Sequence, residues 1–201
     1  MKKLLLGIAA VCLAGFTFAQ DAPLWMRHSV ISPDGTTIAF TYKGDIYTVP
    51  VAGGRAMQIT TNPAYDTAPV WSPDSKRIAF ASDRMGSLDV YIVAKDGGEP
   101  RRLTTHSGSE TPLAFTDAGH VLFSAGIMPS AEAVVFPSNG QFNQVYRVSV
   151  EGGRPTMISS MPMECISINK EGAMLYQDKK GYEDYWRKHH VSPIARDIWM
   201  Y

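Results

Sequence analysis

The sequence has few cysteines, no block of like charges, and no apolar run beyond its N-terminal residues that could span a membrane. Its 201 residues include two cysteines, Cys12 and Cys165, and Cys12 lies within the apolar N-terminal stretch. One cysteine therefore remains for the folded part, which excludes an internal disulfide. A membrane-spanning helix needs about 20 predominantly apolar residues, and no such run follows the N-terminus. We expect no membrane span in the mature chain.

Motifs for nucleic-acid binding and for catalysis are also missing. Lysine and arginine together number 19, as do aspartate and glutamate, and no long basic cluster occurs. G-x-S-x-G, H-E-x-x-H, G-x-G-x-x-G and the P-loop motif are absent. His189 and His190 are adjacent, so on a strand they would point to opposite faces and make a poor pair of metal ligands. We expect no catalytic residue, cofactor or metal in the chain, and no nucleic-acid partner.

The N-terminus has the pattern of an export signal. Lys2 and Lys3 precede an apolar stretch over residues 4–16, and Thr17 and Ala19 place small residues before a cleavage site after Ala19. Without Lys2 and Lys3, 17 basic and 19 acidic residues remain. The pattern predicts a signal peptide over residues 1–19 and an exported, periplasmic mature chain over residues 20–201.

A repeat dominates the rest of the chain. S-P-D-G-T-T-I-A-F over residues 32–40 returns as S-P-D-S-K-R-I-A-F over residues 72–80, and weaker copies follow over residues 116–123 and 169–176. Self-similarity at this period indicates an array of one supersecondary unit that leans on its neighbours. In each unit, a short apolar segment precedes the S-P-D-G-like turn and a β-rich strand follows it. A strand with an acidic or amide residue and an aromatic comes next, such as D-I-Y-T-V over residues 45–49.

Four short strands joined by tight turns, repeated every 40–50 residues, are typical of β-propeller blades. A sandwich or barrel would not explain why turn residues recur at matching places. We therefore predict an all-β fold with three whole four-stranded blades and part of a fourth. Because the last unit reaches only its third strand, we expect a piece of a longer array with exposed sheet edges. The predicted blades cover residues 25–66, 67–110, 111–163 and 164–201.

The connections between strands differ between the two ends of the blades. The first-to-second and third-to-fourth turns stay short, whereas the second-to-third connections grow. Four residues separate Phe40 from Asp45, eight separate Phe80 from Asp89, and 20 separate the matching positions of the third and fourth units. Insertions confined to one face of a repeat fold often mark the working face.

Candidate contact residues lie on this predicted working face. Asp66 and Glu110 occupy equivalent positions there, and Glu164 is one place off register. Either they form an acidic ring that meets the amino group or basic side chains of a peptide, or they are ordinary solvated loop carboxylates. The fourth insertion mixes cations with aromatics, which suits a domain interface, packing of the loop on its own blade, or contact with a peptide carboxylate. Its candidate residues are Trp186, Arg187, Lys188, His189, His190 and Arg196.

Several longer stretches resemble the first propeller of tricorn-protease-like serine peptidases. They include W-M-R-H-S-V-I-S-P-D-G from Trp25, N-P-A-Y-D-T-A-P-V-W-S-P-D over residues 62–74, A-S-D-R-M-G over residues 81–86 and K-G-Y-E-D-Y-W-R-K-H-H over residues 180–190. The S-P-D-G repeats alone also occur in TolB and in dipeptidyl-peptidase propellers. The resemblance covers essentially the whole mature chain.

The resemblance implies an exported multidomain peptidase whose propellers filter and channel peptides. A PDZ domain and a C-terminal domain with the serine nucleophile would follow, and none of those catalytic positions lies in these residues. The implied partners are peptide substrates and downstream domains of the same polypeptide, and a homo-oligomer is left open. Two alternatives are a TolB-like interaction propeller with no enzyme attached and the propeller of a prolyl-oligopeptidase-like enzyme.

Overall fold

The computed structural model describes residues 25–126, 143–161, 163–169, 171–178 and 198–201. Within these ranges the chain forms fifteen strands and no helix. The first sheet contains β1 (Arg27–Ile31), β2 (Thr37–Tyr42), β3 (Asp45–Pro50) and β4 (Met57–Gln58). The second sheet contains β5 (Asp66–Trp71), β6 (Arg77–Ser82), β7 (Asp89–Ala94) and β8 (Arg101–Arg102). The third sheet contains β9 (Glu110–Asp117), β10 (His120–Ala125), β11 (Gln144–Ser149) and β12 (Thr156–Ser159). The fourth sheet contains β13 (Met163–Ile168), β14 (Met174–Asp178) and β15 (Ile198–Met200).

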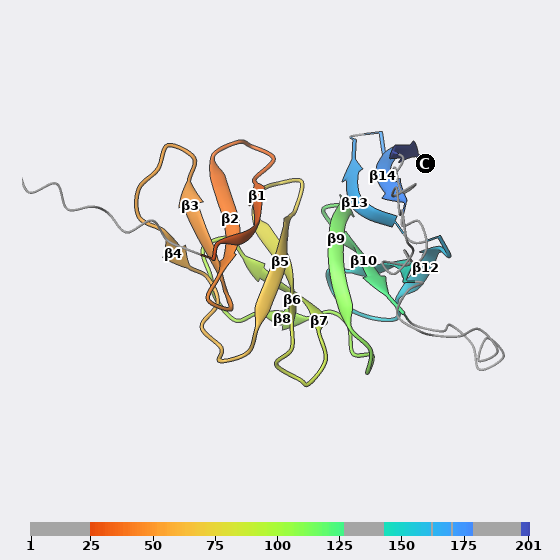
Figure 1. Ribbon diagram of the computed structural model, residues 1–201, viewed down its shortest axis with the longest axis horizontal. Coiled ribbons are helices and arrows are strands. Elements are labelled where there is room, and N and C mark those ends of the chain that lie inside the picture. Colours follow the sequence, from red (N-terminus) through yellow and green to blue (C-terminus); the bar gives the residue numbers. More distant parts are fainter. Residues whose placement is uncertain (1–24, 127–142, 162, 170, 179–197) are drawn as a thin grey trace, which may run out of the picture.

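Each sheet is an antiparallel meander in which strands pair in chain order. The first strands of successive sheets contact one another, and Figure 1 shows β1, β5, β9 and β13 nearest the middle of the array. Later strands of each sheet lie farther out. This arrangement confirms the predicted fold of β-propeller blades, with three four-stranded sheets and one three-stranded sheet among the described residues.

The S-P-D turns join the first and second strands through a repeated hydrogen-bond pattern. The Ser32 hydroxyl donates to Asp34 Oδ1 at 2.5 Å, and the same oxygen accepts the Thr36 backbone N–H at 3.0 Å. These hydrogen bonds, with Ser32 contributing most, lower the pKa of Asp34. The Ser72 hydroxyl donates to Asp74 Oδ1 in the next sheet at 2.6 Å. The repeated turn thus fixes the first strand against the second in the same way twice.

The register shifts in all four first strands, and in three of them a residue with positive φ lies at the shift. His28, Ala68 and Cys165 have φ values of 50°, 52° and 52°, and the strand register shifts at each of them. A single residue with positive φ inside a strand is typical of a bulge. Aligning these bulges places Glu164 at the position of Thr67, one place beyond the Asp66 position, which Met163 occupies.

Apolar side chains fill the space between successive sheets. The face of each sheet toward the preceding sheet, here the leading face, carries an aromatic pair from its second and third strands. The ring centroids of Phe80 and Tyr91 lie 6.0 Å apart, and those of Phe123 and Tyr146 lie 5.6 Å apart. The opposite, trailing face carries smaller residues, such as Ala39 in the first sheet. Because side chains alternate along a strand, each inner sheet packs on both neighbours.

Candidate functional site

A central groove lies between the four first strands at the end where the S-P-D turns are found, which is the end opposite to the predicted working face. Its volume is about 960 Å³. Residues from β1, β5, β9 and β13 line it, together with Pro33 and Pro73 of the two turns. The apolar residues that contribute from the four strands include Val30, Val70, Trp71, Leu113, Ile166 and Ile168.

Trp71 fixes one wall of the groove. Its indole Nε1–H donates to the backbone oxygen of Val30 at 3.2 Å, and only 8% of the residue is exposed. The indole satisfies its polar N–H on the neighbouring sheet while its ring stays among apolar groups. The groove wall is therefore held by contacts between β1 and β5.

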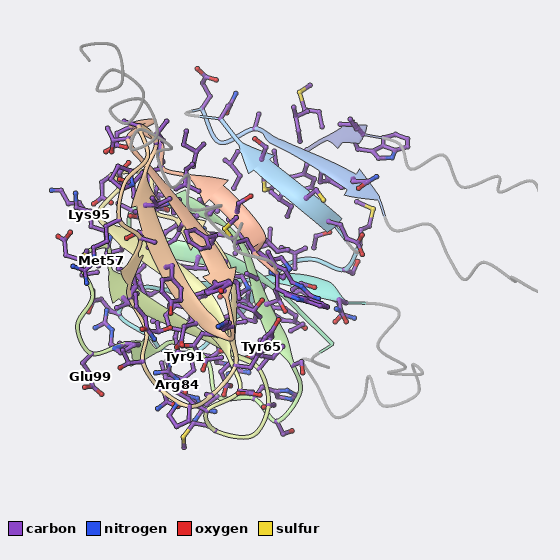
Figure 2. All side chains as sticks on the ribbon, turned by 60° about the vertical axis from the view of Figure 1, so that its left-hand side comes forward. Met57, Tyr65, Arg84, Tyr91, Lys95 and Glu99 are labelled. Carbon is purple, nitrogen blue, oxygen red and sulfur yellow. The ribbon has the colours of Figure 1, made fainter. Side chains whose placement is uncertain are left out.

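A buried ion pair occupies the opposite end of β5. Asp66 is the first residue of β5 and is fully buried, and both of its carboxylate oxygens lie 3.0 Å from Arg84 Nη2. Arg84 comes from the connection between β6 and β7, and its Nε–H donates to the Ser82 hydroxyl at 2.8 Å. The guanidinium carbon lies 4.4 Å from the ring centroid of Tyr91, and Figure 2 shows the two side chains close together. The hydrogen bonds from Arg84 thus offset the cost of burying the Asp66 carboxylate. The Tyr91 ring face in turn stabilises the Arg84 guanidinium.

The corresponding place in the third sheet has a carboxyl without such a cation. Glu110 is the first residue of β9 and is fully buried, and the polar group beside its carboxyl is the Thr104 hydroxyl rather than a cation of its own. Burial raises the pKa of Glu110 to about 7, and the nearby charge of Asp89 acts in the same direction. The Thr104 hydroxyl and the Arg102 charge oppose this change only in part.

Arg102 is instead paired with Asp89. Arg102 Nη2 lies 2.8 Å from Asp89 Oδ2, and the carboxylate is fully buried. Burial is the main cause that raises the pKa of Asp89. Two buried carboxyl groups therefore share the neighbourhood of one guanidinium between the second and third sheets.

The structure places the predicted contact residues in different surroundings. Asp66 and Glu110 occupy equivalent strand ends, as the repeat predicted, but they are buried rather than solvated loop carboxylates. Glu164 is half-buried in β13 at the position of Thr67. The remaining predicted residues, Trp186, Arg187, Lys188, His189, His190 and Arg196, lie outside the described residues.

Sequence reasoning missed Arg84 and Arg102 as partners of buried acids. Arg84 belongs to the A-S-D-R-M-G stretch and follows Phe80 by four residues. The signal in the sequence was limited: Arg84 is the single cation between Phe80 and Asp89, but nothing in the repeat pairs it with Asp66. Arg102 directly precedes the L-T-T segment of the second unit, where the first unit has Gln58 before I-T-T.

Two features are missing from the part of the chain that the structure describes. No group of three or more His, Cys, Asp and Glu side chains there could hold a metal ion. Nor do the described ranges contain a helix with the length and apolarity needed to cross a membrane.

Small antiparallel sheets whose first strands surround a shared inner groove define a β-propeller. Residues 23–201 match the family model of the "Tricorn protease N-terminal beta propeller domain". The chain belongs to this family, which confirms the resemblance seen in the sequence.

Individual proteins show the same relationship. The Tricorn protease homolog 1 of Streptomyces coelicolor is 25% identical over 180 residues, which cover 89% of this chain and 16% of that protein. The chain thus spans about a sixth of the length of this relative.

Solved structures show the shared fold. The putative TolB from Agrobacterium tumefaciens superposes with a TM-score of 0.63 at 18% identity, over 78% of this chain and 55% of that chain. The crystal structure of the tricorn protease superposes with a TM-score of 0.56 at 12% identity, over 79% of this chain and 19% of that chain.

Proposed function

We propose that the chain is the non-catalytic propeller region of an exported tricorn-like serine peptidase, in which it gates or channels peptide substrates and docks other domains. The observation that carries the proposal is the central groove, with its volume of about 960 Å³ and its walls from four successive first strands. Ligand sites in proteins occupy about 300–1,000 Å³ and are mostly apolar. In this proposal residues 1–19 direct export and residues 20–201 form the propeller.

The groove suits a peptide with apolar side chains. Most of its lining side chains are apolar, whereas Thr116, Asp117, Ser167 and Asn169 supply polar groups. Apolar walls can bind the apolar side chains of a peptide without requiring a particular sequence. Polar groups near the rim can form hydrogen bonds with the peptide backbone. Such a surface can pass many peptides, which is what a gate requires.

Peptide binding tests this role. Ala114 lines the groove in β9, and Ala118 lies exposed in the turn that follows the same strand. We expect a fluorescently labelled apolar peptide to bind the wild-type chain and to bind Ala114→Asp about tenfold more weakly, equal to about 1.4 kcal/mol. Ala118→Asp is the matched control and should bind as the wild type does. Fluorescence anisotropy gives the affinities, and thermal unfolding shows whether both variants fold.

Equal binding by the wild type and Ala114→Asp would show that the groove is not where the proposed gate binds peptide. Hydrolysis of the peptide by the purified chain, at a rate that does not fall on repurification, would contradict a non-catalytic role. These two results are independent of each other, so binding and catalysis are tested separately.

A TolB-like interaction propeller with no enzyme attached is the second candidate. It is favoured by the TM-score of 0.63 with the putative TolB structure, above the 0.56 found with the tricorn protease. The reading frame that follows the Tyr201 codon distinguishes the two. Further blades with PDZ and protease domains would support the peptidase, and a stop codon would support the interaction module.

A further inference from the structure

Each first strand has one edge without a partner strand in the described part of the chain. The strand orders place β1, β5, β9 and β13 at one end of their sheets, and each pairs with the second strand of its own sheet. Figure 1 shows these strands nearest the middle of the array, and they line the central groove. An unpaired strand edge presents backbone N–H and C=O groups that can bind another extended chain.

The central groove runs along the edge of β9 rather than over one of its faces. Ala114 and Phe115 pair with successive residues of β10, so their side chains point to opposite faces of the sheet. Both nevertheless line the groove, together with the rest of the stretch 113–117. A groove over one face would be lined by alternate residues. The lining by consecutive residues therefore places the strand edge at the groove.

This free edge belongs to an inner sheet. Phe115 packs in the apolar cluster between the second and third sheets, and Leu122 packs in the cluster between the third and fourth sheets. Described neighbours thus cover both faces of the third sheet, and β9 contacts β5 on one side and β13 on the other. The open edge of β9 is therefore independent of the two terminal sheets.

The alternation of backbone hydrogen bonds directs Phe115 to the groove. In the second sheet the Ser72 N–H donates to the backbone oxygen of Arg77 at 2.9 Å. Because alternate residues of an antiparallel pair exchange such bonds with the partner strand, Trp71 directs its N–H and C=O to the other side, toward the groove. Phe115 occupies the place of Trp71 in the third sheet, so its backbone groups have the same direction.

Small side chains leave room for a further strand beside β9. Val30 and Val70 occupy equivalent places in β1 and β5, where β9 has Ala114 and β13 has Ser167. All four residues line the groove. A peptide backbone can therefore approach β9 more closely than it can approach β1 or β5.

We propose that an extended peptide binds in the central groove as an added β-strand on the free edge of β9, with its backbone hydrogen-bonded to that of Phe115. Backbone pairing of this kind gives affinity that does not depend on the peptide sequence, whereas pockets for side chains add specificity. It suits a surface that passes many peptides. This inference rests on the proposed function and names how its peptide is held.

N-methylation of the peptide backbone tests the binding mode. The probe is a fluorescently labelled peptide of six residues in which valine and alanine alternate. One derivative carries N-methyl groups on three alternate residues, which blocks one edge of the extended peptide and leaves the other intact. The second derivative carries three N-methyl groups on consecutive residues, which interrupts both edges. The two derivatives are matched in composition and in added apolar surface.

Fluorescence anisotropy gives the affinities for the wild-type chain. We expect the alternate derivative to bind within about twofold of the unmodified peptide and the consecutive derivative to bind about tenfold more weakly. Equal binding by the two derivatives would overturn the added strand, although peptide binding in the groove would stand. Absence of binding by the unmodified peptide would contradict the proposed function and this inference together.

Hydrogen exchange of the chain locates the added strand. Saturating unmodified peptide should slow exchange of the Phe115 amide about tenfold. The Trp71 amide, at the equivalent place in β5, is the matched control and should exchange as it does without peptide. Slower exchange at Trp71 and not at Phe115 would place the peptide on another edge and overturn the assignment to β9.

Discussion

Two otherwise similar sheet junctions differ in whether the buried carboxyl group has an arginine as its partner. In the second sheet Asp66 has Arg84, and in the third sheet Glu110 has no cation of its own. The sequence places Ile127 four residues after Phe123, where the second unit has Arg84 four residues after Phe80. Burial raises the pKa of Glu110, and no arginine stands at the matching place in the repeat to oppose this as Arg84 does for Asp66.

Glu110 should make the chain less stable as the pH rises toward neutrality. The pKa of Glu110 is about 7 in the folded chain and 4.5 as the ordinary value. Between these values the unfolded chain loses the proton first, so the unfolded state binds fewer protons and the free energy of unfolding falls as the pH rises. The full effect is on the order of 3 kcal/mol and is complete above the folded pKa. We expect Glu110→Gln, which has no such proton, to lack this part of the pH dependence.

Urea unfolding between pH 4 and 8 measures this effect as the difference between wild type and Glu110→Gln. Asp45 and Asp89 also have raised pKa values, but both proteins retain them, so their contribution cancels in the difference. Glu99→Gln, at an exposed position, is the control and should keep the wild-type slope. Parallel curves for wild type and Glu110→Gln would contradict the assignment.

At the scale of elements, side-chain contacts fix the connection between β6 and β7 to the strands beside it. Arg84 binds Asp66 of β5, and Asp83 Oδ1 accepts the backbone N–H of Tyr65 at 2.7 Å. The connection is therefore held at two points, to β5 and to the link that precedes it. A short insertion that is anchored in this way becomes part of the sheet junction.

Loss of Arg84 should destabilise the chain far more than loss of an exposed arginine. Arg84→Ala leaves the fully buried Asp66 carboxylate without a cation, which costs about 3–5 kcal/mol in comparable buried pairs. Arg101 forms an exposed pair with Glu151 at 2.8 Å, with side chains 48% and 73% exposed. Arg101→Ala should cost less than about 1 kcal/mol, since exposed pairs contribute little. Urea unfolding gives both values.

A second variant separates the unpaired charge from lost packing. Arg84→Ala combined with Asp66→Asn removes the charge as well as its partner, and it should recover part of the stability lost in Arg84→Ala alone. Equal losses in Arg84→Ala and Arg101→Ala would show that the buried pair does not stabilise the junction.

The strands could be predicted from the sequence because the same turn residues recur at matching places in successive units. D-V-Y-I-V marks β7, and the S-P-D turn precedes β6 in the second sheet as it precedes β2 in the first. The bulges could not be predicted, because Ala68 and Cys165 have no preference for positive φ and adopt it only in the packed strand. Burial of Asp66 was missed for a related reason. Its partner Arg84 lies eighteen residues away, in a connection whose path depends on the whole sheet.

At the scale of the whole molecule, the four sheets differ in how many neighbours cover them. The second and third sheets are packed on both faces, and the strands at their centres are almost completely buried. The first and fourth sheets each have one described neighbour, and every residue of β15 is exposed. In an array whose stability comes from nearest-neighbour contacts, opening should therefore begin at the two ends.

Native-state hydrogen exchange should reveal this gradient. We expect the slowest backbone amides in β6, β7, β10 and β11 and the fastest protected amides in β1 and β15. Uniform exchange across the four sheets would contradict stability that comes from nearest-neighbour contacts.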